Sequence, residues 1–450
     1  MARRGQTTSL AERIEIGERW EAGQKDPEIA VVMNLPVWTV RKWRRKYQKE
    51  GRSGLGSGMG RPRIGALGQS PLELRDTIRE MRESHPGWGP ITIRTELAGM
   101  SHFTGLKLPS RPRIAAFLKQ EGLARKYDRH VTLPQPKATD PQRAHEEWEM
   151  DAQGAIKLPE LGRVSIINII DLFSRVKVGS LPCLNPAHPS TPDYQLALRL
   201  AFVDYGLPQR MSLDHDSVFF DNAHASPFPS LLHLWLIALG VEVRFIDERP
   251  PAAHSVIERG HQTMSQQAIA GQHISNEAAL HQSLAARLDF LNSRYPSRSL
   301  AGQPPLIAHP EARHSGRLYR LEWEEDLLDM HRVYDYLAKG RWFRRVGPVG
   351  VFSLGHYRYA VGRTFSNQTF EVTFDSQTLE FVCLPADGRE KMRIPTTGLT
   401  KSALMGELSP LMACPVYQLA LPFSPSAWRE MMLANELTVR LCETLPGTTL

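Results

Sequence analysis

Two adjoining stretches decide the fold of this chain: His145–Pro159, HEEWEMDAQGAIKLP, and Arg163–Leu184, RVSIINIIDLFSRVKVGSLPCL. In the second stretch, the runs Val164–Ile170 and Val176–Leu181 are rich in Val and Ile, as partly buried strands are. Asp151 lies on, or at the end of, a strand just before these runs. The pattern predicts a domain whose sheet begins as a strand meander.

Helices and strands alternate after this meander. We expect a helix over 194–205, a short strand over 209–220 that ends in acids, a helix over 231–239, a strand over 241–246, and a helix that carries Glu258. Such an order favours a mixed sheet with helices on its faces.

Three short segments in this region carry a recognisable pattern: Trp148–Asp151 (WEMD), Leu213–Ser217 (LDHDS) and His254–Arg259 (HSVIER). They resemble the core of retroviral integrases and bacterial insertion-sequence transposases, the DDE family. That family has an aspartate after a tryptophan, an aspartate in an Asp-Asn-Gly-Ser-like strand end and a glutamate in an Asn-Gly-x-x-Glu-Arg-like helix start. The resemblance covers most of residues 10–310 and is strongest from 148 to 260.

The resemblance implies an RNase H-like core in which Asp151, Asp214 and Glu258 are catalytic and bind metal. Asp214 follows Asp151 by 63 residues and Glu258 follows Asp214 by 44, which suits the family if the second interval holds a modest insertion. The family also implies that water first exposes a 3′-hydroxyl, which then attacks target DNA. Oxygen ligands suit Mg²⁺, and two ions about 3.5 to 4 Å apart serve phosphoryl displacement, with Mn²⁺ as a substitute.

The chain departs from the family pattern in two places. Asp216 stands where the family has glycine, and His254-Ser255 replaces Asn-Gly. Two other acids compete for the catalytic positions. Glu248 is rejected as the third acid because it precedes the Pro250-Pro251 loop, whereas the family glutamate follows that loop on a helix. Asp171 rivals Asp151, but the family acid at its position has a structural or supporting role.

Residues 1–52 are expected to form a helix-turn-helix domain. Three helices are predicted: Leu10–Ala22, one that opens at Asp26-Pro27, and Val37–Lys49. The third is a basic recognition helix that would bind DNA, although a solvated charged face on any helical bundle gives the same pattern. Its proposed DNA-binding residues are Arg41, Lys42, Arg44, Arg45 and Lys46.

A flexible basic linker is expected over 53–70, in which Arg61 and Arg63 resemble a minor-groove hook or simply belong to a basic linker. A second helix-turn-helix-like DNA-binding domain follows over 71–126, with helices from Leu72, from Pro90 and over 110–123. Arg111 and Arg113 lie at its recognition end. A further linker over 127–145 leads to the catalytic core, 146–312, in which Arg259 flanks Glu258 and is expected to approach DNA.

The C-terminal part is expected to contain a helix over 317–338 and a small β-barrel, together forming a domain over 313–397. The barrel strands are predicted at 351–354, 357–361, 369–374 and 379–384. A helical tail over 398–450 completes the multidomain α/β architecture. DNA contact by the barrel and contact with protein are equally open.

The composition fits these expectations without deciding between them. The chain has 450 residues, of which 41% are hydrophobic, and 55 Lys+Arg against 48 Asp+Glu give a net charge of +7, which suits a polyanionic partner. Its four cysteines lie far apart and form no CxxC pair, which favours reduced thiols over a zinc site. No apolar run is long enough for a membrane span or a signal peptide, so we expect a bacterial cytoplasmic protein near the nucleoid.

The leading hypothesis is an active transposase or integrase with double-stranded DNA, both element ends and target, as its partner. A homo-oligomer on DNA and a helper ATPase are further expected partners. The alternative is a catalytically inactive, domesticated DNA-binding regulator that keeps the fold. A nuclease of the same fold that cuts without joining is a third reading, which the two N-terminal modules disfavour.

Overall fold

The computed structural model describes residues 8–56, 65–124, 140–184, 188–246, 255–385, 388 and 391–406. The chain divides into two compact units, Met1–Gln69 and Ser70–Leu450. Each unit has its own core, and we describe each by itself. Arg61 and Arg63 lie outside the described residues.

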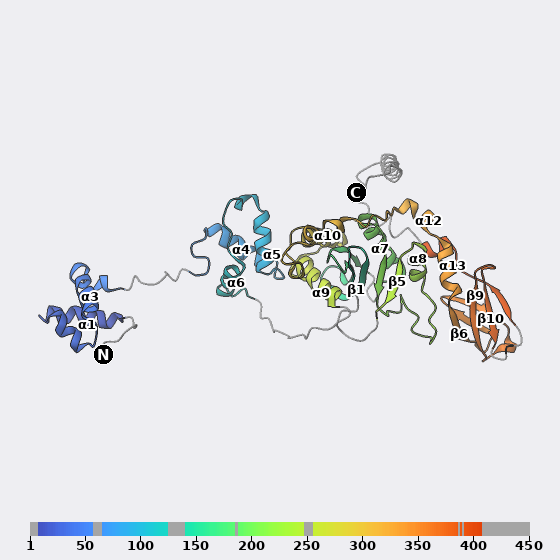
Figure 1. Cartoon of the computed structure of the whole chain (residues 1–450), viewed down its shortest axis with the longest axis horizontal. Coiled ribbons are helices and arrows are strands. Elements are labelled where there is room, and N and C mark those ends of the chain that lie inside the picture. Colours follow the sequence, from blue (N-terminus) through green and yellow to red (C-terminus); the bar gives the residue numbers. More distant parts are fainter. Residues whose placement is uncertain are drawn as a thin grey trace. The chain divides into compact units, whose positions relative to one another are not determined.

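The first unit holds the three expected helices, α1 (Leu10–Glu21), α2 (Asp26–Val32) and α3 (Val37–Glu50) (Figure 1). The capping box between Ser9 and Glu12 begins α1 where the sequence predicts it. Ile16, Ile29, Val40, Trp43 and Tyr47 form the core, and a short 3₁₀ turn adds Leu55. Gly17 lets the Tyr47 ring approach closely, since a Cβ there would lie 2.5 Å from that ring.

The second unit begins with the second helical module. It comprises α4 (Leu72–Ser84), α5 (Pro90–Gly99) and α6 (Arg111–Gln120). The helices bury Leu74, Ile78, Leu97 and Phe117 among themselves. Helical spacing and the Pro residues in the first turns of α5 and α6 account for these boundaries.

A five-stranded mixed sheet forms the centre of the second unit. Its strands are β1 (Glu147–Leu158), β2 (Gly162–Asp171), β3 (Lys177–Cys183), β4 (Arg210–Leu213) and β5 (Glu242–Phe245), in the order β3-β2-β1-β4-β5. The β1, β2 and β3 strands form the antiparallel meander, and β4 and β5 add in parallel beside β1. The expected mixed sheet is therefore present.

Helices cover both faces of this sheet (Figure 1). On one face α7 (Thr191–Tyr205) and α8 (Leu231–Ala238) pack Phe202 and Trp235 into the same core as Trp148 and Met211. On the other face lie α9 (Ser255–Met264), a π-helical turn (Ser265–Ile269) and α10 (Glu277–Ser293). Their apolar side chains pack with Val164 and Ile166 of β2.

The C-terminal region differs from the expected barrel. Its elements are α11 (Pro305–Ala308), α12 (Glu324–Leu327), α13 (Met330–Ala338), β6 (Arg341–Arg345), β7 (Val351–Leu354), β8 (Tyr357–Ala360), β9 (Thr369–Asp375), β10 (Glu380–Pro385), β11 (Met392–Pro395) and α14 (Lys401–Met405). Within the described residues, the strands form an open four-stranded sheet, β11-β10-β9-β6, and a separate β7-β8 hairpin. The closed barrel is not confirmed, because β6 and β11 stay edge strands and the hairpin pairs only with itself.

The helix expected in this region is shorter than predicted, and the expected tail is described only in part. The helix predicted over 317–338 is confined to α12 and α13, because the backbone around Leu328 is extended between them. Of the tail, only residues up to 406 are described, so the helical pattern expected beyond them lies outside the described residues. Among the helices that the structure describes, none has the length and apolar character needed to cross a bilayer.

Candidate functional site

The sheet brings Asp151, within β1, and Asp214, just after β4, to neighbouring strands. In the parallel β1–β4 pair, Glu149 lies opposite Ser212. Asp151 lies two residues further along β1, and Asp214 is the first residue after β4 ends at Leu213. Neighbouring strands of a sheet lie about 4.8 Å apart. Alternation along β1 turns Asp151 away from the buried face that holds Met150. Two acids that are 63 residues apart in sequence thus become neighbours.

The hydroxyl of Tyr194 on α7 lies within electrostatic range of the same acids. Burial raises the pKa of Tyr194, and the negative charges of Asp216, Asp151 and Asp214 raise it further. Three carboxylates therefore lie near enough to one phenol to act on it electrostatically. The sequence reasoning did not single out Tyr194, which appeared only as part of an apolar helix.

Glu258 lies in the first turn of α9, and its side chain is exposed. Helix α9 packs against both β1 and β2, so it crosses the strand that carries Asp151. The residues just before it, including Glu248 and His254, lie outside the described ranges. Within the part of the chain that the structure describes, no three His, Cys, Asp or Glu side chains are arranged to hold a metal ion.

A chain of buried polar groups leads to Asp151. His261, one turn after Glu258, contacts Asp151 with 2.9 Å between Nε2 and Oδ2. Its Nδ1 lies 2.7 Å from the Asn168 amide nitrogen, and the Asn168 amide oxygen accepts a hydrogen bond of 2.8 Å from Ser180 Oγ. No motif in the sequence marks His261 or Asn168 as functional. Only the cross-strand pairing of Asn168 with Asp151, and the spacing of His261 from Glu258, could have drawn attention to them.

Asp171, the rival to Asp151, has a different environment. Its carboxylate is fully buried and accepts hydrogen bonds from the Ser174 backbone, the Ser174 hydroxyl and the His145 backbone. Burial raises the pKa of Asp171, and the bonds from Ser174 and His145 oppose that rise. This carboxylate holds the turn between β2 and β3 and fixes the approach to β1.

Asp216, which replaces the family glycine, shapes the loop after β4. Its backbone N–H donates to Asp214 Oδ1 at 3.1 Å, and its own Oδ1 accepts from the Val218 N–H at 3.0 Å. An aspartate that bonds two residues onward forms an Asx turn, so this departure has a local structural role.

The segment HPGWGP, residues 85–90, joins the second helical module to the helices behind the site. Trp88 Nε1 donates to the Gln267 carbonyl oxygen in the π-helical turn at 3.2 Å, and Gln267 Nε2 donates to Thr92 Oγ1 at 3.0 Å. The two backbones touch here: a Cβ on Gly87 would lie 1.8 Å from the Gln266 carbonyl oxygen. This module therefore packs against the continuation of the helix that carries Glu258.

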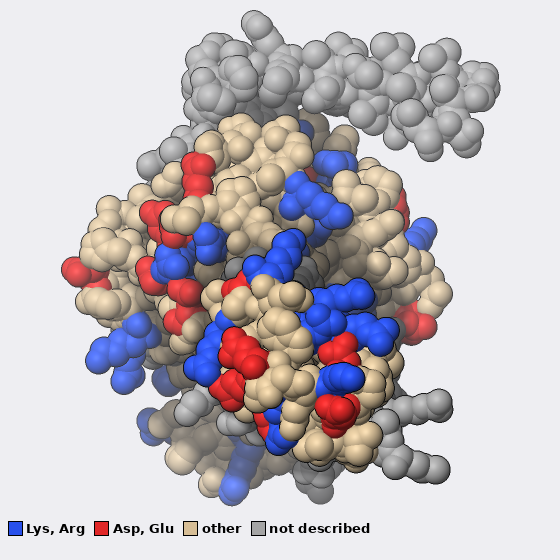
Figure 2. Space-filling view, turned by 90° about the vertical axis from the view of Figure 1, so that its left-hand side faces the viewer, with Lys and Arg blue, Asp and Glu red and all other residues tan. Residues whose placement is uncertain are grey.

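The predicted DNA-binding residues of α3 differ in their exposure and in the side chains that they contact. Arg44 is partly buried and forms two hydrogen bonds to Asp26, of 3.1 and 3.2 Å. Arg45 is exposed, Arg41 is half-exposed beside Asp26, and the amines of Lys42 and Lys46 lie over the Trp43 ring. Acidic side chains lie among the basic ones in this view of the molecule (Figure 2).

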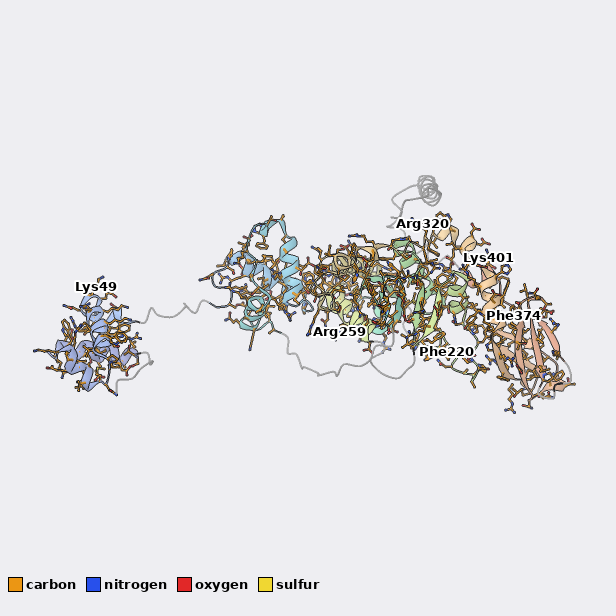
Figure 3. The ribbon with its side chains drawn as sticks, in the orientation of Figure 1. Lys49, Phe220, Arg259, Arg320, Phe374 and Lys401 are labelled. Carbon is orange, nitrogen blue, oxygen red and sulfur yellow. The ribbon has the colours of Figure 1, made fainter. Side chains whose placement is uncertain are left out.

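Each unit also carries further exposed side chains that are candidates for DNA contact. Arg111 and Arg113 in the first turn of α6 are exposed, and so is Arg259 on α9 (Figure 3). Trp38, which the sequence reasoning passed over, begins α3 with 69% of its surface exposed. In a helix-turn-helix, the start of the recognition helix is the part that meets base edges.

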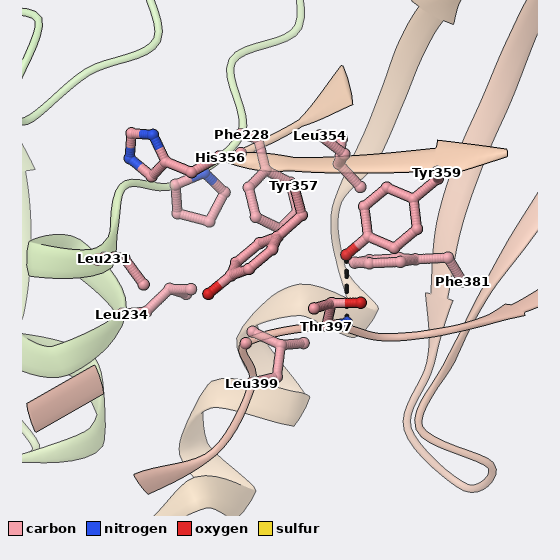
Figure 4. A pocket seen from close by; sticks show the side chains of 13 residues that line it. Phe228, Leu231, Leu234, Leu354, His356, Tyr357, Tyr359, Phe381, Thr397 and Leu399 are labelled. Atoms are coloured by element: carbon pink, nitrogen blue, oxygen red, sulfur yellow. Dashed lines mark hydrogen bonds between the residues drawn. The ribbon is translucent and has the colours of Figure 1, made fainter. Parts of the chain in front are cut away.

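A small apolar pocket lies between α8, the β7–β8 hairpin and β10 (Figure 4). Phe228, Leu234, Tyr357 and Phe381 line it, and the Tyr359 hydroxyl at its edge accepts a hydrogen bond from the Thr397 backbone. None of the three candidate acids lines it, so it is not the candidate active site.

Known proteins are similar to this chain in two ways. Residues 7–56 match the model of a homeodomain-like domain. Among solved structures, the chain is similar to the catalytic core domain of BIV integrase, with 16% identity over 37% of this chain and 95% of that one and a TM-score of 0.28.

Two further solved structures are similar at 12% identity. A chain of the simian T-cell lymphotropic virus intasome in complex with the PP2A regulatory subunit B56 gamma matches 67% of this chain and 96% of its own length, with a TM-score of 0.32. The HTLV-2 integrase catalytic core in complex with magnesium, in its dimeric form, matches 38% and 99%, with a TM-score of 0.28. The chain itself joins a homeodomain-like domain to a mixed α/β domain.

Proposed function

We propose that this chain is a DNA transposase or integrase that binds element ends and cuts and joins DNA through Asp151, Asp214 and Glu258. Residues 146–312 would be its RNase H-like core. The observation that carries the proposal is the parallel pairing of β1 with β4, which puts Asp151 on one strand and Asp214 just after the end of its neighbour, beside the helix that bears Glu258. A homeodomain-like domain on the same chain supports DNA as the substrate.

The donor set suits Mg²⁺, with Mn²⁺ as its substitute. Two aspartates from neighbouring strands offer hard oxygen ligands, and Glu258, exposed in the first turn of α9, would supply a third carboxylate. We propose that these three residues hold two ions. Bound there, the metal would activate the attacking oxygen and stabilise the leaving oxygen.

The rest of the chain would bring DNA to these acids and keep it in place. The first unit would read an end sequence through α3, and Arg111, Arg113 and Arg259 would contact phosphates, which fix position without reading sequence. We further propose that the chain works as a homo-oligomer on DNA, because joining two ends to one target needs two active sites. A bacterial cytoplasm would supply that DNA.

The proposal is tested with the purified full-length chain, labelled element ends, a target plasmid and Mg²⁺ or Mn²⁺. Asp151→Asn, Asp214→Asn and Glu258→Gln should each lower strand transfer by roughly 10³-fold or more, because residues that act as one catalytic unit fail together. Removal of the divalent ion with a chelator should abolish the reaction. Both steps, end cleavage and joining, are scored separately.

Asp216→Asn is the matched control, because asparagine keeps an oxygen that can accept the Val218 N–H. It should retain activity within a few-fold of the wild type. Loss of joining in Asp216→Asn together with full activity in Asp214→Asn would show that the second acid is wrongly assigned. Cleavage of DNA without joining by the wild-type chain would identify a nuclease instead.

A second candidate function is a DNA-binding regulator that has lost cleavage. It is favoured by the departures from the family pattern, in which Asp216 stands in place of glycine and His254-Ser255 in place of Asn-Gly. In the same assay this candidate predicts specific end binding with no cleaved or joined product in either metal, with or without an added helper ATPase.

A further inference from the structure

We propose that His261 is a positioning residue, which orients the Asp151 carboxylate toward Asp214 through a hydrogen bond from Nε2. This inference rests on the proposed function and adds a residue to its site. It starts from the contact of 2.9 Å between His261 Nε2 and Asp151 Oδ2. The imidazole is almost fully buried, so water competes little for this hydrogen bond.

The partners of His261 decide which ring nitrogen carries the proton. Ser180 Oγ donates to the Asn168 amide oxygen, which turns the Asn168 NH₂ group toward the imidazole. In this orientation of the Asn168 amide, the NH₂ group donates and Nδ1 of His261 accepts. In the neutral ring the proton therefore sits on Nε2, and Nε2 donates to Asp151.

The same hydrogen bonds exclude two other roles for the imidazole in this arrangement. Its Nδ1 lone pair is occupied by Asn168, and its Nε2 bears the proton given to Asp151. Neither nitrogen has a lone pair left for a metal or for a substrate proton. His261 thus acts through Asp151, as carboxylate-orienting groups do around metal ligands.

Close packing of α9 on β2 brings His261 within hydrogen-bond distance of Asp151. Gly260, the residue before His261, lets α9 lie directly on β2, where a Cβ would come within 2.4 Å of Ile170 Cδ1. Ile170 and Asn168 share the sheet face that Asp151 also occupies, since Asn168 pairs with Asp151 across the strands. One helix therefore carries the third acid, Glu258, and orients the first.

The Asp151 carboxylate is held from two sides. Its Oδ1 accepts the Ala152 N–H at 2.7 Å, and its Oδ2 accepts His261 Nε2. Loss of the second bond leaves a carboxylate that can rotate, which lowers its affinity for a cation without removing any ligand. Such second partners typically account for about 10- to 100-fold in metal affinity.

The test compares His261→Gln with His261→Leu in the full-length chain. The glutamine amide can still donate to Asp151, whereas leucine fills similar space without a donor. We expect His261→Leu to weaken Mn²⁺ binding, followed by electron paramagnetic resonance without DNA, by about 10- to 100-fold. The Mn²⁺ concentration for half-maximal strand transfer should rise to match, and His261→Gln should stay within a few-fold of the wild type.

A readout that needs no metal follows the ring itself. In the chain labelled with ¹⁵N-histidine, the His261 nitrogens should report a proton on Nε2, and Asn168→Ala should weaken that preference. Asp151→Asn is the reference for a lost ligand, and thermal unfolding checks that each variant is folded.

Two results overturn the inference. One is His261→Leu, folded, with wild-type Mn²⁺ binding; the other is equal loss in the Gln and Leu variants, which would mean that packing rather than the hydrogen bond matters. A wild-type chain that neither binds Mn²⁺ nor joins DNA would contradict the proposed function itself. The ¹⁵N tautomer would separate these cases, because it reports the hydrogen bond whether or not the chain is an enzyme.

Discussion

The two N-terminal helical modules look alike in sequence and differ in what holds them. Each has three helices, of which the third is basic: α3 in the first module and α6 in the second. The first closes its own core around Ile16, Val40 and Tyr47 and forms a separate compact unit. The second also reaches into the sheet domain through Trp88. A basic helix in a sequence therefore does not tell whether its module stands alone or is built into its neighbour.

A buried ion pair holds the second helical module against α10. Arg287 of α10 pairs with Glu96 of α5, and its guanidinium lies 4.6 Å from the Trp88 ring centroid and 3.8 Å from that of Phe290. Burial lowers the pKa of Arg287, while Glu96 opposes this. An ion pair with this little exposure gives a defined geometry more than net stability.

Gly87→Ser should have the largest effect, because it disrupts only the contact between the second helical module and the π-helical turn. A Cβ there would lie 1.8 Å from the Gln266 carbonyl oxygen, so the module must move away at a cost of about 3 kcal/mol. Hydrogen–deuterium exchange of the full-length chain should show lost protection in α4–α6 and in the π-helical turn, and none in α1–α3.

Gly89→Ser is the matched control. Nothing lies within 4 Å of a Cβ at Gly89, and serine is a good N-cap for α5. Its exchange pattern should equal that of the wild type. Unchanged protection in Gly87→Ser would mean that the second module is as independent as the first.

The next prediction compares how the stability of the two units depends on pH. Residues 1–69 contain no histidine, whereas the second unit contains buried ones. In the second unit, burial lowers the pKa of His233 and of His145 to about 4 each. Below pH 6.5 these histidines bind protons in the unfolded chain but not in the folded chain. The free energy of unfolding therefore falls as pH decreases from 6.5 toward 4. For His233 this amounts to about 2.5 kcal/mol at pH 4.5.

His233→Phe isolates that contribution, because Phe245 and Tyr336 already surround the ring with aromatic groups. Urea unfolding of the second unit at pH 7 and pH 4.5 should show a smaller loss in the variant than in the wild type. The first unit should stay unchanged over that window, because the pKa of Asp26 is lowered, chiefly by its hydrogen bond to Arg44, and its effect comes at lower pH. An equal loss in both proteins would contradict the assignment to His233.

Local pattern was enough to predict most elements but not their partners. The helices of the first unit follow from apolar spacing and a capping box, and the Val164–Ile170 run marks β2, because these signals lie within a few residues of one another. The placement of Asp151 and Asp214 at neighbouring strands could be expected only through a family resemblance. Strand register is set by contacts that are distant in sequence.

What the sequence could not reveal depends on side chains that meet across the fold. His261 and Asn168 are 93 residues apart, and an isolated histidine on a helix gives no sign of such a contact. The edges of the C-terminal sheet were likewise hidden, because alternating strands predict pairing but not closure. Charge counting placed Arg44 and Arg45 together, although only one of them is tied to Asp26.

That last pair gives the smallest expected effect and the finest test of the first module. Exposed Arg45→Ala should weaken DNA binding alike for all sequences and lower the slope of log K against log salt by about 1, with stability within about 0.5 kcal/mol. Arg44→Ala should cost about 1 kcal/mol of stability by freeing Asp26. Its salt slope should change less, because a guanidinium already held by a carboxylate releases few counterions. Equal slopes would mean that Arg44 leaves Asp26 for DNA, so that the ion pair between α2 and α3 is exchanged for phosphate contacts.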